Sequence, residues 1–315
     1  MNWKKLGQIF DPTKVEGKDF MNSHVQCPST LIFDDFVRVY FSCRPKPVNG
    51  QYVSYTAFID LDRKDLTKVI RIADKPIMEL GALGTFDEFA IYPTSILDLR
   101  IAKTIFLYYA GWNRCQSVPY NCSIGMAISY DNGETFSRFS KGPILTRSED
   151  EPFELSGPKI RTFKDKAYMF YLAGEGWQKD GDKSESIYKI RLAIGGYHSF
   201  DKLNKNIIPQ KLNEFECQAG PDVFFKDGIY HMYFSYRYGL NFRNKERGYK
   251  IGYAYSEDLI TWTRDDEQAG IKLSEEGWDS EMMHYPHVFE LDNKWYMLYN
   301  GNDFGRYGLG LATMI

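Results

Sequence analysis

The chain has 315 residues, of which 43% are hydrophobic and 26% charged. These values are ordinary for a folded globular protein and exclude a disordered or fibrous chain. The net charge is −3, from 39 basic and 42 acidic side chains, so there is no basic excess of the kind that nucleic-acid binding requires. Aromatic residues reach 16%, with 23 Tyr and 22 Phe, and both residue types favour β-strands.

The N-terminal segment MNWKKLGQIFDP has too few apolar residues for a signal peptide, and no stretch has the roughly 18 apolar residues of a membrane span. The five cysteines include no CxxC pair, which argues against structural zinc. Cys115 and Cys122 are near enough in sequence to bridge, but an odd number of cysteines fits reduced thiols better. We therefore expect a cytoplasmic protein.

A short pattern recurs along the whole chain: a proline, a few apolar residues, a polar turn and an aromatic run. It reads CPSTLIFDDFVRVYFS, YPTSILDLRIAKTIFLYYAG, GPKIRTFKDKAYMFYLAG, GPDVFFKDGIYHMYFSY and YPHVFELDNKWYMLYNG. The spacings between the successive prolines are 65, 65, 63 and 65 residues. The prolines are Pro28, Pro93, Pro158, Pro221 and Pro286. Such a period is the mark of a repeat architecture.

Each copy predicts a β-hairpin, because turn residues separate two β-rich runs. Further strands follow in most units, as in SIGMAISYDNGETFSR and YKIGYAYSEDLITWTR, and no segment shows helical periodicity. The last unit lacks its final strand, which the N-terminal LGQIF can supply. We predict an all-β, five-bladed propeller of four-stranded antiparallel blades over residues 1–315, with units starting near residues 24, 88, 154, 216 and 281. Two β-sandwiches are the alternative, but they would not explain one register held throughout.

In such a blade the first strand lines the axis, and its start lies at the same mouth as the end of the second strand. Acids stand just before the prolines in four of the five units. Crowded carboxylates have diverging pKa values, as general acid–base pairs require. The candidate catalytic residues are Glu216, Asp87, Asp279, Glu88 and Glu281, and Glu154 stands in the third unit. The alternative for any one acid is a solvated loop position or a turn cap.

A second ring is predicted two residues beyond each aromatic run. Its members are Arg44, Trp112, Glu175, Arg237 and Asn302, and His24 and His284 lie in the loops before two prolines. We expect these seven residues to bind substrate, since a sugar site combines an aromatic platform with polar side chains. Two arginines on one rim favour an anionic substrate group, unless each pairs with a neighbouring Glu.

The segment SYDNGETF, residues 129–136, matches the Asp-box pattern, and SEDLITW is a looser copy. We expect both to form turns between third and fourth strands on the outer face, not catalytic sites. No P-loop, GxSxG, HExxH or dinucleotide-binding fingerprint is present in the sequence.

The repeats and the strings FECQAGPDVFF and YAYSEDLITW resemble the five-bladed propeller glycosidases of the arabinanase, levansucrase and invertase superfamily. The strings HVQCPSTL, GTFDEFAIYP, YYAGW, GWDSEMMHYP and YNGN are similar to uncharacterised propeller proteins encoded with surface-polysaccharide genes. This resemblance implies three central carboxylates: a base or nucleophile, a general acid, and an Asp that tunes the acid.

The sequence departs from that pattern at three places. Cys27 replaces the Asp before the first proline, and Ser156 replaces the Glu before Gly-Pro in the third unit. Glu216 resembles the general acid, with an offset of three residues before Pro221. The resemblance therefore implies Glu216 as proton donor, with Asp87 and Asp279 as its partners.

The leading hypothesis is a glycoside hydrolase-type enzyme of surface-polysaccharide or oligosaccharide metabolism, acting on a carbohydrate partner. The alternatives are a glycosyl transferase or phosphorylase that uses an anionic activated sugar, and a non-catalytic glycan-binding or assembly propeller. No cofactor is required, although a central Ca²⁺ is compatible with oxygen ligands.

Overall fold

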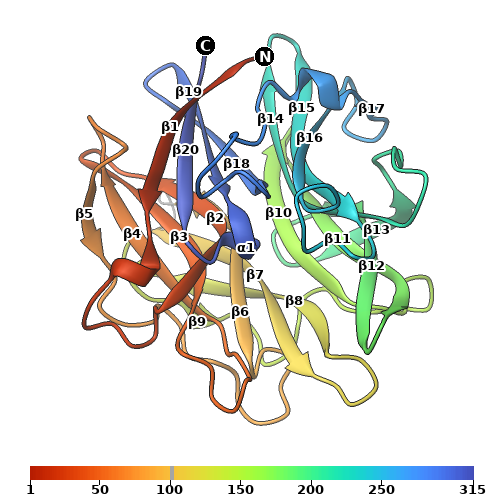
Figure 1. Cartoon of the computed structure of the whole chain (residues 1–315). Helices are drawn as coiled ribbons and strands as arrows, with labels where there is room; N and C mark the ends of the chain where they lie inside the picture. The colour runs from red at the N-terminus through yellow and green to blue at the C-terminus, as the bar shows by residue number, and fades with distance from the viewer. Residues whose placement is uncertain (100–102) are drawn as a thin grey trace.

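Five four-stranded antiparallel sheets surround one axis in the computed structural model, which describes residues 1–99 and 103–315 (Figure 1). The first blade contains β2 (Ser23–Ile32), β3 (Phe36–Arg44), β4 (Tyr55–Asp62) and β5 (Val69–Ile72). The second contains β6 (Ala90–Leu99), β7 (Thr104–Arg114), β8 (Tyr120–Ser129) and β9 (Ser137–Arg138). The third contains β10 (Leu155–Phe163), β11 (Lys166–Asp180), β12 (Lys183–Gly195) and β13 (Phe200–Asn206).

The fourth blade contains β14 (Glu216–Lys226), β15 (Ile229–Tyr238), β16 (Lys250–Ser256) and β17 (Thr263–Arg264). The fifth is built from both ends of the chain: β18 (His284–Leu291), β19 (Lys294–Asn300), β20 (Leu309–Met314) and β1 (Trp3–Phe10). Short helical turns cover Pro12–Lys14, Asp266–Ala269 and α1 (Asn302–Gly305). The predicted all-β propeller of five blades is confirmed.

The hairpins form where the sequence places turn residues. Asp292 and Asn293 join β18 to β19 with φ of 50° and 60°. Two successive positive φ values match the twist of the flanking strands, and Asp and Asn tolerate them better than most residues. The Asp-box prediction is also confirmed as a turn, because the Asp131 carboxylate accepts hydrogen bonds from the backbone and side chain of Thr135 at 3.0 and 2.6 Å.

A bulge interrupts the inner strand beside the repeat proline. The residue before the proline has a positive φ in four units: Cys27 (58°), Gly157 (57°), Gly220 (55°) and Tyr285 (50°). The pairing of the inner strand with its neighbour shifts register at each of these places. β-Bulges redirect side chains and occur near functional sites. The bulges therefore mark the axial mouth as the place to examine.

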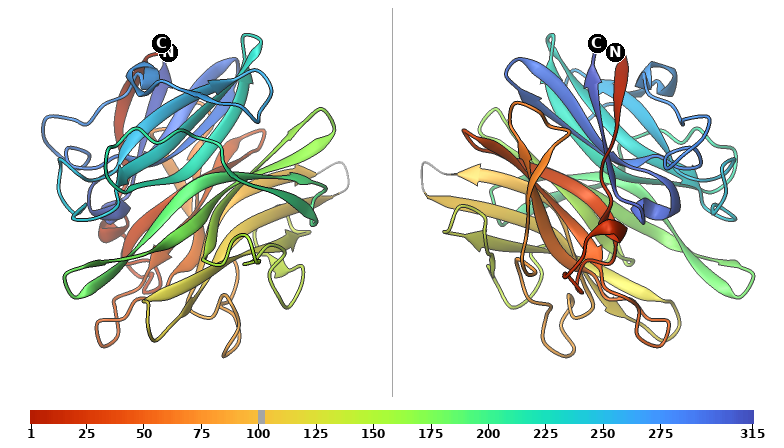
Figure 2. Two further views of the ribbon diagram at one scale, coloured as in Figure 1. Left: turned by 90° about the vertical axis from the view of Figure 1, so that its right-hand side faces the viewer. Right: turned by 60° about the vertical axis from the view of Figure 1, so that its left-hand side comes forward.

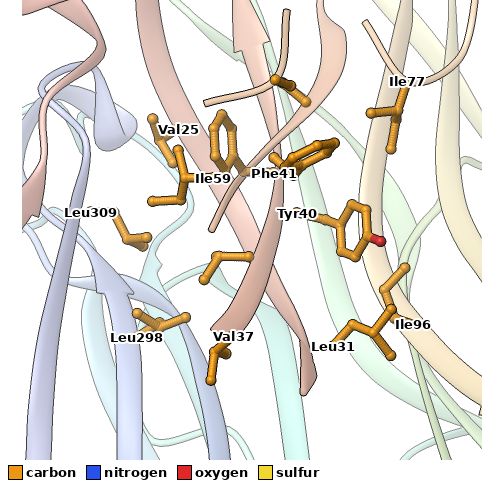
Figure 3. Close-up of a cluster of buried hydrophobic side chains, with 14 of the residues drawn as sticks. Val25, Leu31, Val37, Tyr40, Phe41, Ile59, Ile77, Ile96, Leu298 and Leu309 are labelled. Atoms are coloured by element: carbon orange, nitrogen blue, oxygen red, sulfur yellow. The ribbon is translucent and has the colours of Figure 1, made fainter. Parts of the chain in front are cut away.

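The hydrophobic core lies between neighbouring blades. Figure 3 shows Val37, Tyr40 and Phe41 of β3 between side chains of the adjoining second and fifth blades, such as Ile96 and Leu298. These side chains are buried, and they alternate along strands whose two faces both pack against other blades. The packing of each blade on its neighbours thus fixes where the inner strands point.

The ring closes by pairing the N-terminal β1 with the C-terminal β20, and the two ends of the chain lie side by side (Figures 1 and 2). This confirms the predicted closing strand, which begins at Trp3. Trp3 is buried, and its Nε1 donates a hydrogen bond to the Tyr233 hydroxyl at 2.9 Å. The closing strand is therefore anchored to the fourth blade as well. Across the described part of the chain, no helix is long and apolar enough to cross a membrane.

We predict that Trp3→Ala lowers the free energy of unfolding by about 3–5 kcal/mol, because it empties a buried aromatic site at the seam of the ring. Urea unfolding followed by fluorescence would measure this. Leu6→Ala on the same strand is the control, since Leu6 is exposed and its loss should change little. Equal effects of the two substitutions would contradict an anchoring role for Trp3.

Candidate active site

A pocket opens at one mouth of the axis, where the inner strands start. The residue before each of the five repeat prolines lines it: Cys27, Tyr92, Gly157, Gly220 and Tyr285. Its volume is about 100 Å³. At roughly 10–15 Å³ per water this is space for several water molecules, or for one small ring. The expectation that these segments surround one mouth is confirmed.

The walls of the pocket are largely aromatic. Trp112 stacks on Tyr92 at 5.1 Å between ring centroids and lies in tilted contact with Tyr120 at 4.2 Å. Tyr188 and Tyr285 face the same space. The Nε1 of Trp112 is buried and has no hydrogen-bond partner among the described residues. A buried donor without a partner is rare and costly, so this group is available to a polar ligand.

Glu154 is the one carboxylic acid that lines the pocket among the residues the structure describes. It is 2% exposed, and its Oε1 accepts a hydrogen bond from Ser186 while Oε2 has no partner. Burial raises the pKa of Glu154, and the Ser186 hydrogen bond only partly offsets this rise. A Cβ at Gly174 would lie 2.8 Å from Oε2, so the glycine there makes room for the carboxyl group. Glu154 is thus a carboxyl group with a raised pKa, as a proton donor requires.

Lys159 is the one cation lining the pocket among the described residues. Its side chain is buried, and its Nζ lies 3.8 Å from Asp222 Oδ2. Burial lowers the pKa of Lys159 to about 8, although the Asp222 charge opposes the change. Cys27 lies in the same pocket, and burial raises the pKa of its thiol to about 12. The Cys27 thiol is therefore protonated at neutral pH.

None of the five predicted catalytic acids lines this pocket. Asp87 accepts hydrogen bonds from Arg138 at 2.8 Å and from the Tyr109 hydroxyl at 2.9 Å. Asp279 accepts one from Lys5 at 2.7 Å. In both cases the acid precedes the inner strand and the cation lies on the outer strand of the same blade.

A similar arrangement recurs in two more blades, with Glu151 before β10 and Glu216 as the first residue of β14. Glu216 pairs with Arg264 at 2.6 Å, and Glu151 pairs with Lys202 at 2.9 Å. We call these contacts the blade ion pairs: Asp87–Arg138, Glu151–Lys202, Glu216–Arg264 and Asp279–Lys5. All four carboxylates are buried. A catalytic role for Glu216, Asp87 and Asp279 stays a prediction, while their contacts favour a structural one.

The two reserve acids lie outside the pocket as well. Glu88 is half-buried and accepts a hydrogen bond from the backbone of Gly84 at 2.9 Å. Glu281 is exposed, and its backbone N–H donates to Asn302. Both residues thus take part in loop hydrogen bonds, as expected if these acids are loop positions or turn caps and not catalytic groups.

Of the predicted substrate-binding residues, Trp112 lines the pocket and two arginines support its walls. Arg44 donates to the Tyr92 hydroxyl at 2.8 Å, and Arg237 donates to the Tyr188 hydroxyl at 2.9 Å. Arg237 is buried with its guanidinium 3.5 Å from the centre of the Phe242 ring, a cation–π contact. Neither arginine lines the pocket; each holds a tyrosine that does.

The other four predicted residues do not line the pocket. His24 is buried beside Ser23, and burial together with the charges of Arg44 and Arg306 lowers its pKa to about 2. Burial likewise lowers the pKa of His284 to about 3.

Asn302 accepts hydrogen bonds from the backbone of Glu281 and Met282 at 2.8 and 3.0 Å. Glu175 is exposed and accepts a hydrogen bond from Asn206. In the second blade Trp112 pairs with Ala90, three residues before the proline, and in the third blade the corresponding Leu155 pairs with Ala173, so Ala173, and not Glu175, occupies the position of Trp112.

The pocket residues can be found in the sequence by comparing equivalent positions of the five repeats. A search for the acid nearest to each proline misses them. Four residues before the prolines stand His24, Phe89, Glu154, Cys217 and Met282. Glu154 is the one acid in this series. Directly after the prolines stand Ser29, Thr94, Lys159, Asp222 and His287, all of them polar. Comparing repeat positions, rather than counting acids in the loops, would have found both pocket residues.

Within the described residues, no group of three or more His, Cys, Asp or Glu side chains is placed to hold a metal ion. Asp279 and Asp87 are paired with cations, Lys5 and Arg138, so Glu154 is the one pocket carboxylate among the described residues that could offer a free oxygen. These side chains do not fit a central Ca²⁺, which prefers several unpaired oxygen ligands. The five cysteines are free thiols.

The fold is similar to that of the five-bladed propeller glycosidases. A solved glycoside hydrolase matches 98% of this chain and 90% of its own, with a TM-score of 0.77 and 16% identity. A thermostable family-43 glycoside hydrolase matches 96% and 91%, with a TM-score of 0.64 and 13% identity. Identities this low show a shared fold.

The chain belongs to the same family as "Uncharacterized protein Rv1502" of Mycobacterium tuberculosis. The two are 34% identical over 316 residues, which cover 100% of this chain and 99% of the relative. A second relative is the "Beta-1,2-mannobiose phosphorylase" of a Thermoanaerobacter species, 34% identical over 109 residues. That match covers 31% of this chain and 35% of the relative. No protein-family model matches the chain.

We predict that Glu216→Gln lowers the free energy of unfolding by about 1–3 kcal/mol, because it removes one of the two carboxylates that face the buried Arg264 and leaves Asp266, 3.0 Å away, as its one charged partner among the described contacts. Burial alone would raise the pKa of Glu216, but the Arg264 charge and the Leu212 backbone N–H outweigh it, so the pKa is lowered. The stabilisation is therefore full above the ordinary Glu pKa and is lost as the pH falls through the lower folded value.

Urea unfolding at pH 7 and at pH 3–4 would test this, with Glu281→Gln as the exposed control. The difference between Glu216→Gln and the unsubstituted protein should shrink at the lower pH. A Glu216→Gln protein as stable as the control at pH 7 would contradict a structural role.

Proposed function

We propose that this protein cleaves or forms a glycosidic bond by phosphorolysis, with Glu154 as proton donor and inorganic phosphate as nucleophile. In the cleavage direction a phosphate oxygen bonds to the anomeric carbon, the glycosidic C–O bond breaks, and the Glu154 proton goes to the departing oxygen. The reverse reaction joins a sugar 1-phosphate to an acceptor sugar and releases phosphate.

The observation that carries this proposal is the charge of the pocket lining. Retaining and inverting hydrolysis both require two carboxyl groups that flank the bond, one as acid and one as base or nucleophile. The described pocket lining has one carboxyl group, Glu154, and one cation, Lys159. An acid together with a bound phosphate needs no second carboxylate, because the phosphate is the nucleophile.

Two further features support the proposal. The aromatic walls formed by Trp112, Tyr120 and Tyr188 suit the faces of a sugar ring, and the unpaired Trp112 Nε1 offers it a hydrogen bond. The partial match to a β-1,2-mannobiose phosphorylase makes a mannoside the first substrate to test. The hydrolase hypothesis from the sequence remains the competing function, since glycoside hydrolases share the fold.

The direct test is turnover of mannobioses, β-1,2-linked first, with and without inorganic phosphate, followed by release of sugar 1-phosphate. The reverse reaction should also be assayed from sugar 1-phosphates and a panel of acceptor sugars. Turnover that requires phosphate supports the proposal, whereas equal cleavage without phosphate would establish hydrolysis instead. Absence of both turnover and ligand binding would favour the non-catalytic assembly hypothesis.

We predict that Glu154→Gln lowers kcat by about 10²–10⁴-fold, since an amide cannot donate the proton that general acid catalysis supplies. The kcat of Glu216→Gln is measured for comparison, at a temperature where this variant is folded and with the rate expressed per folded molecule. The raised pKa and the pocket position of Glu154 support it as the acid, whereas the family resemblance implies Glu216. Full activity of Glu154→Gln with loss of turnover in Glu216→Gln would reverse the assignment.

A further inference from the structure

The residues directly after the repeat prolines form a polar layer beneath the pocket. Three of them make a buried cluster contributed by three different blades. Lys159 Nζ lies 3.2 Å from His287 Nδ1, and Asp222 Oδ2 lies 2.7 Å from the same nitrogen. Lys159 faces the pocket, while His287 and Arg161 line a cavity on the opposite side of the propeller. The cluster therefore extends from the pocket floor toward the other mouth.

The hydrogen bonds determine which nitrogen of His287 carries the proton. The backbone N–H of Thr30 donates to Nε2 at 3.0 Å, and a backbone N–H can only donate. Nε2 must therefore be the acceptor, and Nδ1 carries the hydrogen that is donated to Asp222. The Thr30 hydroxyl, 2.8 Å from Nε2, also donates. His287 is held neutral, in a single tautomer.

This tautomer leaves the Lys159 ammonium free of a hydrogen bond to His287, because both groups are donors. Asp222 is shared between Arg161 and Lys159, so one carboxylate faces two cations and the cluster carries a net positive charge. A buried charge without full compensation is unfavourable until an opposite charge arrives. An oxyanion in the pocket would supply that charge.

The titration behaviour of the cluster agrees with its geometry. Burial and the charge of Lys159 lower the pKa of His287 to about 4, so it stays neutral near pH 7. Although burial by itself would raise the pKa of Asp222, the Arg161 and Lys159 charges hold it well below its usual range. Cys27 also faces Lys159, and its raised pKa keeps it uncharged. Lys159 is thus the member of the cluster whose charge changes between pH 7 and 9.

We propose that His287 and Asp222 are positioning residues, which hold the Lys159 ammonium at the pocket floor with its protons directed at a bound oxyanion. The inference rests on the proposed function, in which that oxyanion is inorganic phosphate. It adds that anion affinity depends on the proton donated by His287 Nδ1, although His287 touches neither the sugar nor the phosphate. Loss of that proton would let Asp222 draw Lys159 into a closer ion pair and away from the ligand.

The test compares two polar variants of one histidine. His287→Asn keeps an N–H donor near the Nδ1 position, whereas His287→Gln keeps an acceptor near Nε2 and removes the donor to Asp222. Binding of inorganic phosphate and of sulfate is measured by calorimetry from pH 6.5 to 9.5. Sulfate is included because its charge is constant over this range. His231→Gln is the matched control, because His231 is a buried histidine that is hydrogen-bonded to the Tyr253 hydroxyl and does not line the pocket.

In the unsubstituted protein sulfate affinity should fall as the pH rises through about 8, where Lys159 loses its proton. His287→Gln should weaken sulfate binding at pH 7 by about 10–100-fold, by analogy with the effect of removing a residue that orients a metal ligand. Its alkaline decline should move to higher pH, because Asp222 then stabilises the charged Lys159 more strongly. His287→Asn and His231→Gln should stay close to the unsubstituted protein.

Equal sulfate affinity and an equal pH profile in His287→Gln and His287→Asn would overturn the positioning role, since a structural role predicts no difference between them. Lys159→Met separates this failure from that of the proposed function. If Lys159→Met abolishes anion binding while His287→Gln does not change it, the positioning role alone is wrong. If the unsubstituted protein binds neither phosphate nor sulfate, the phosphorolysis proposal fails together with this inference.

Discussion

The blade ion pairs are the interaction on which the arrangement of this propeller depends. In each of four blades a buried carboxylate before or at the start of the inner strand contacts a cation on the outer strand, as in Asp87–Arg138 and Glu216–Arg264. A carboxylate this deeply buried is tolerable only with a partner close by. Each ion pair connects the start of the innermost strand of a blade to its outermost strand. It also turns these acids away from the axis, and so decides which side chains the pocket contains.

The repeat proline organises the pocket in a complementary way. The residue before it lines the cavity in every blade, and a bulge with positive φ turns Cys27 and Tyr285 toward it. Non-glycine residues in this conformation carry strain, which the surrounding structure must hold. The residue after the proline points to the polar layer beneath, which contains Lys159 and His287. One repeated tripeptide, the proline with the residues on either side of it, thus supplies both the lining and the floor of the site.

The electrostatics of the pocket follow from these two constraints. Because the blade ion pairs occupy four of the acids, Glu154 lies among aromatic rings with its pKa raised, in the same pocket as the buried cation Lys159. Such a pocket favours a neutral acid and a bound anion over a pair of ionised carboxylates. The shared fold with glycoside hydrolases is compatible with this difference, since the fold fixes where a site forms and not which groups it contains.

The sequence by itself determined the five-bladed fold, its closure by the N-terminal strand and the mouth at which the pocket opens. These properties depend on periodic patterns: prolines 65, 65, 63 and 65 residues apart, and β-rich runs that alternate with turn residues. Only the tertiary structure decided which acids face the pocket. The partner of Glu216 lies 48 residues away on the outer strand, and that of Asp279 lies 274 residues away at the other end of the chain. The sequence does not show whether a carboxylate in a loop points to the axis or pairs with a cation. Its orientation depends on which neighbours pack against it and compensate its charge.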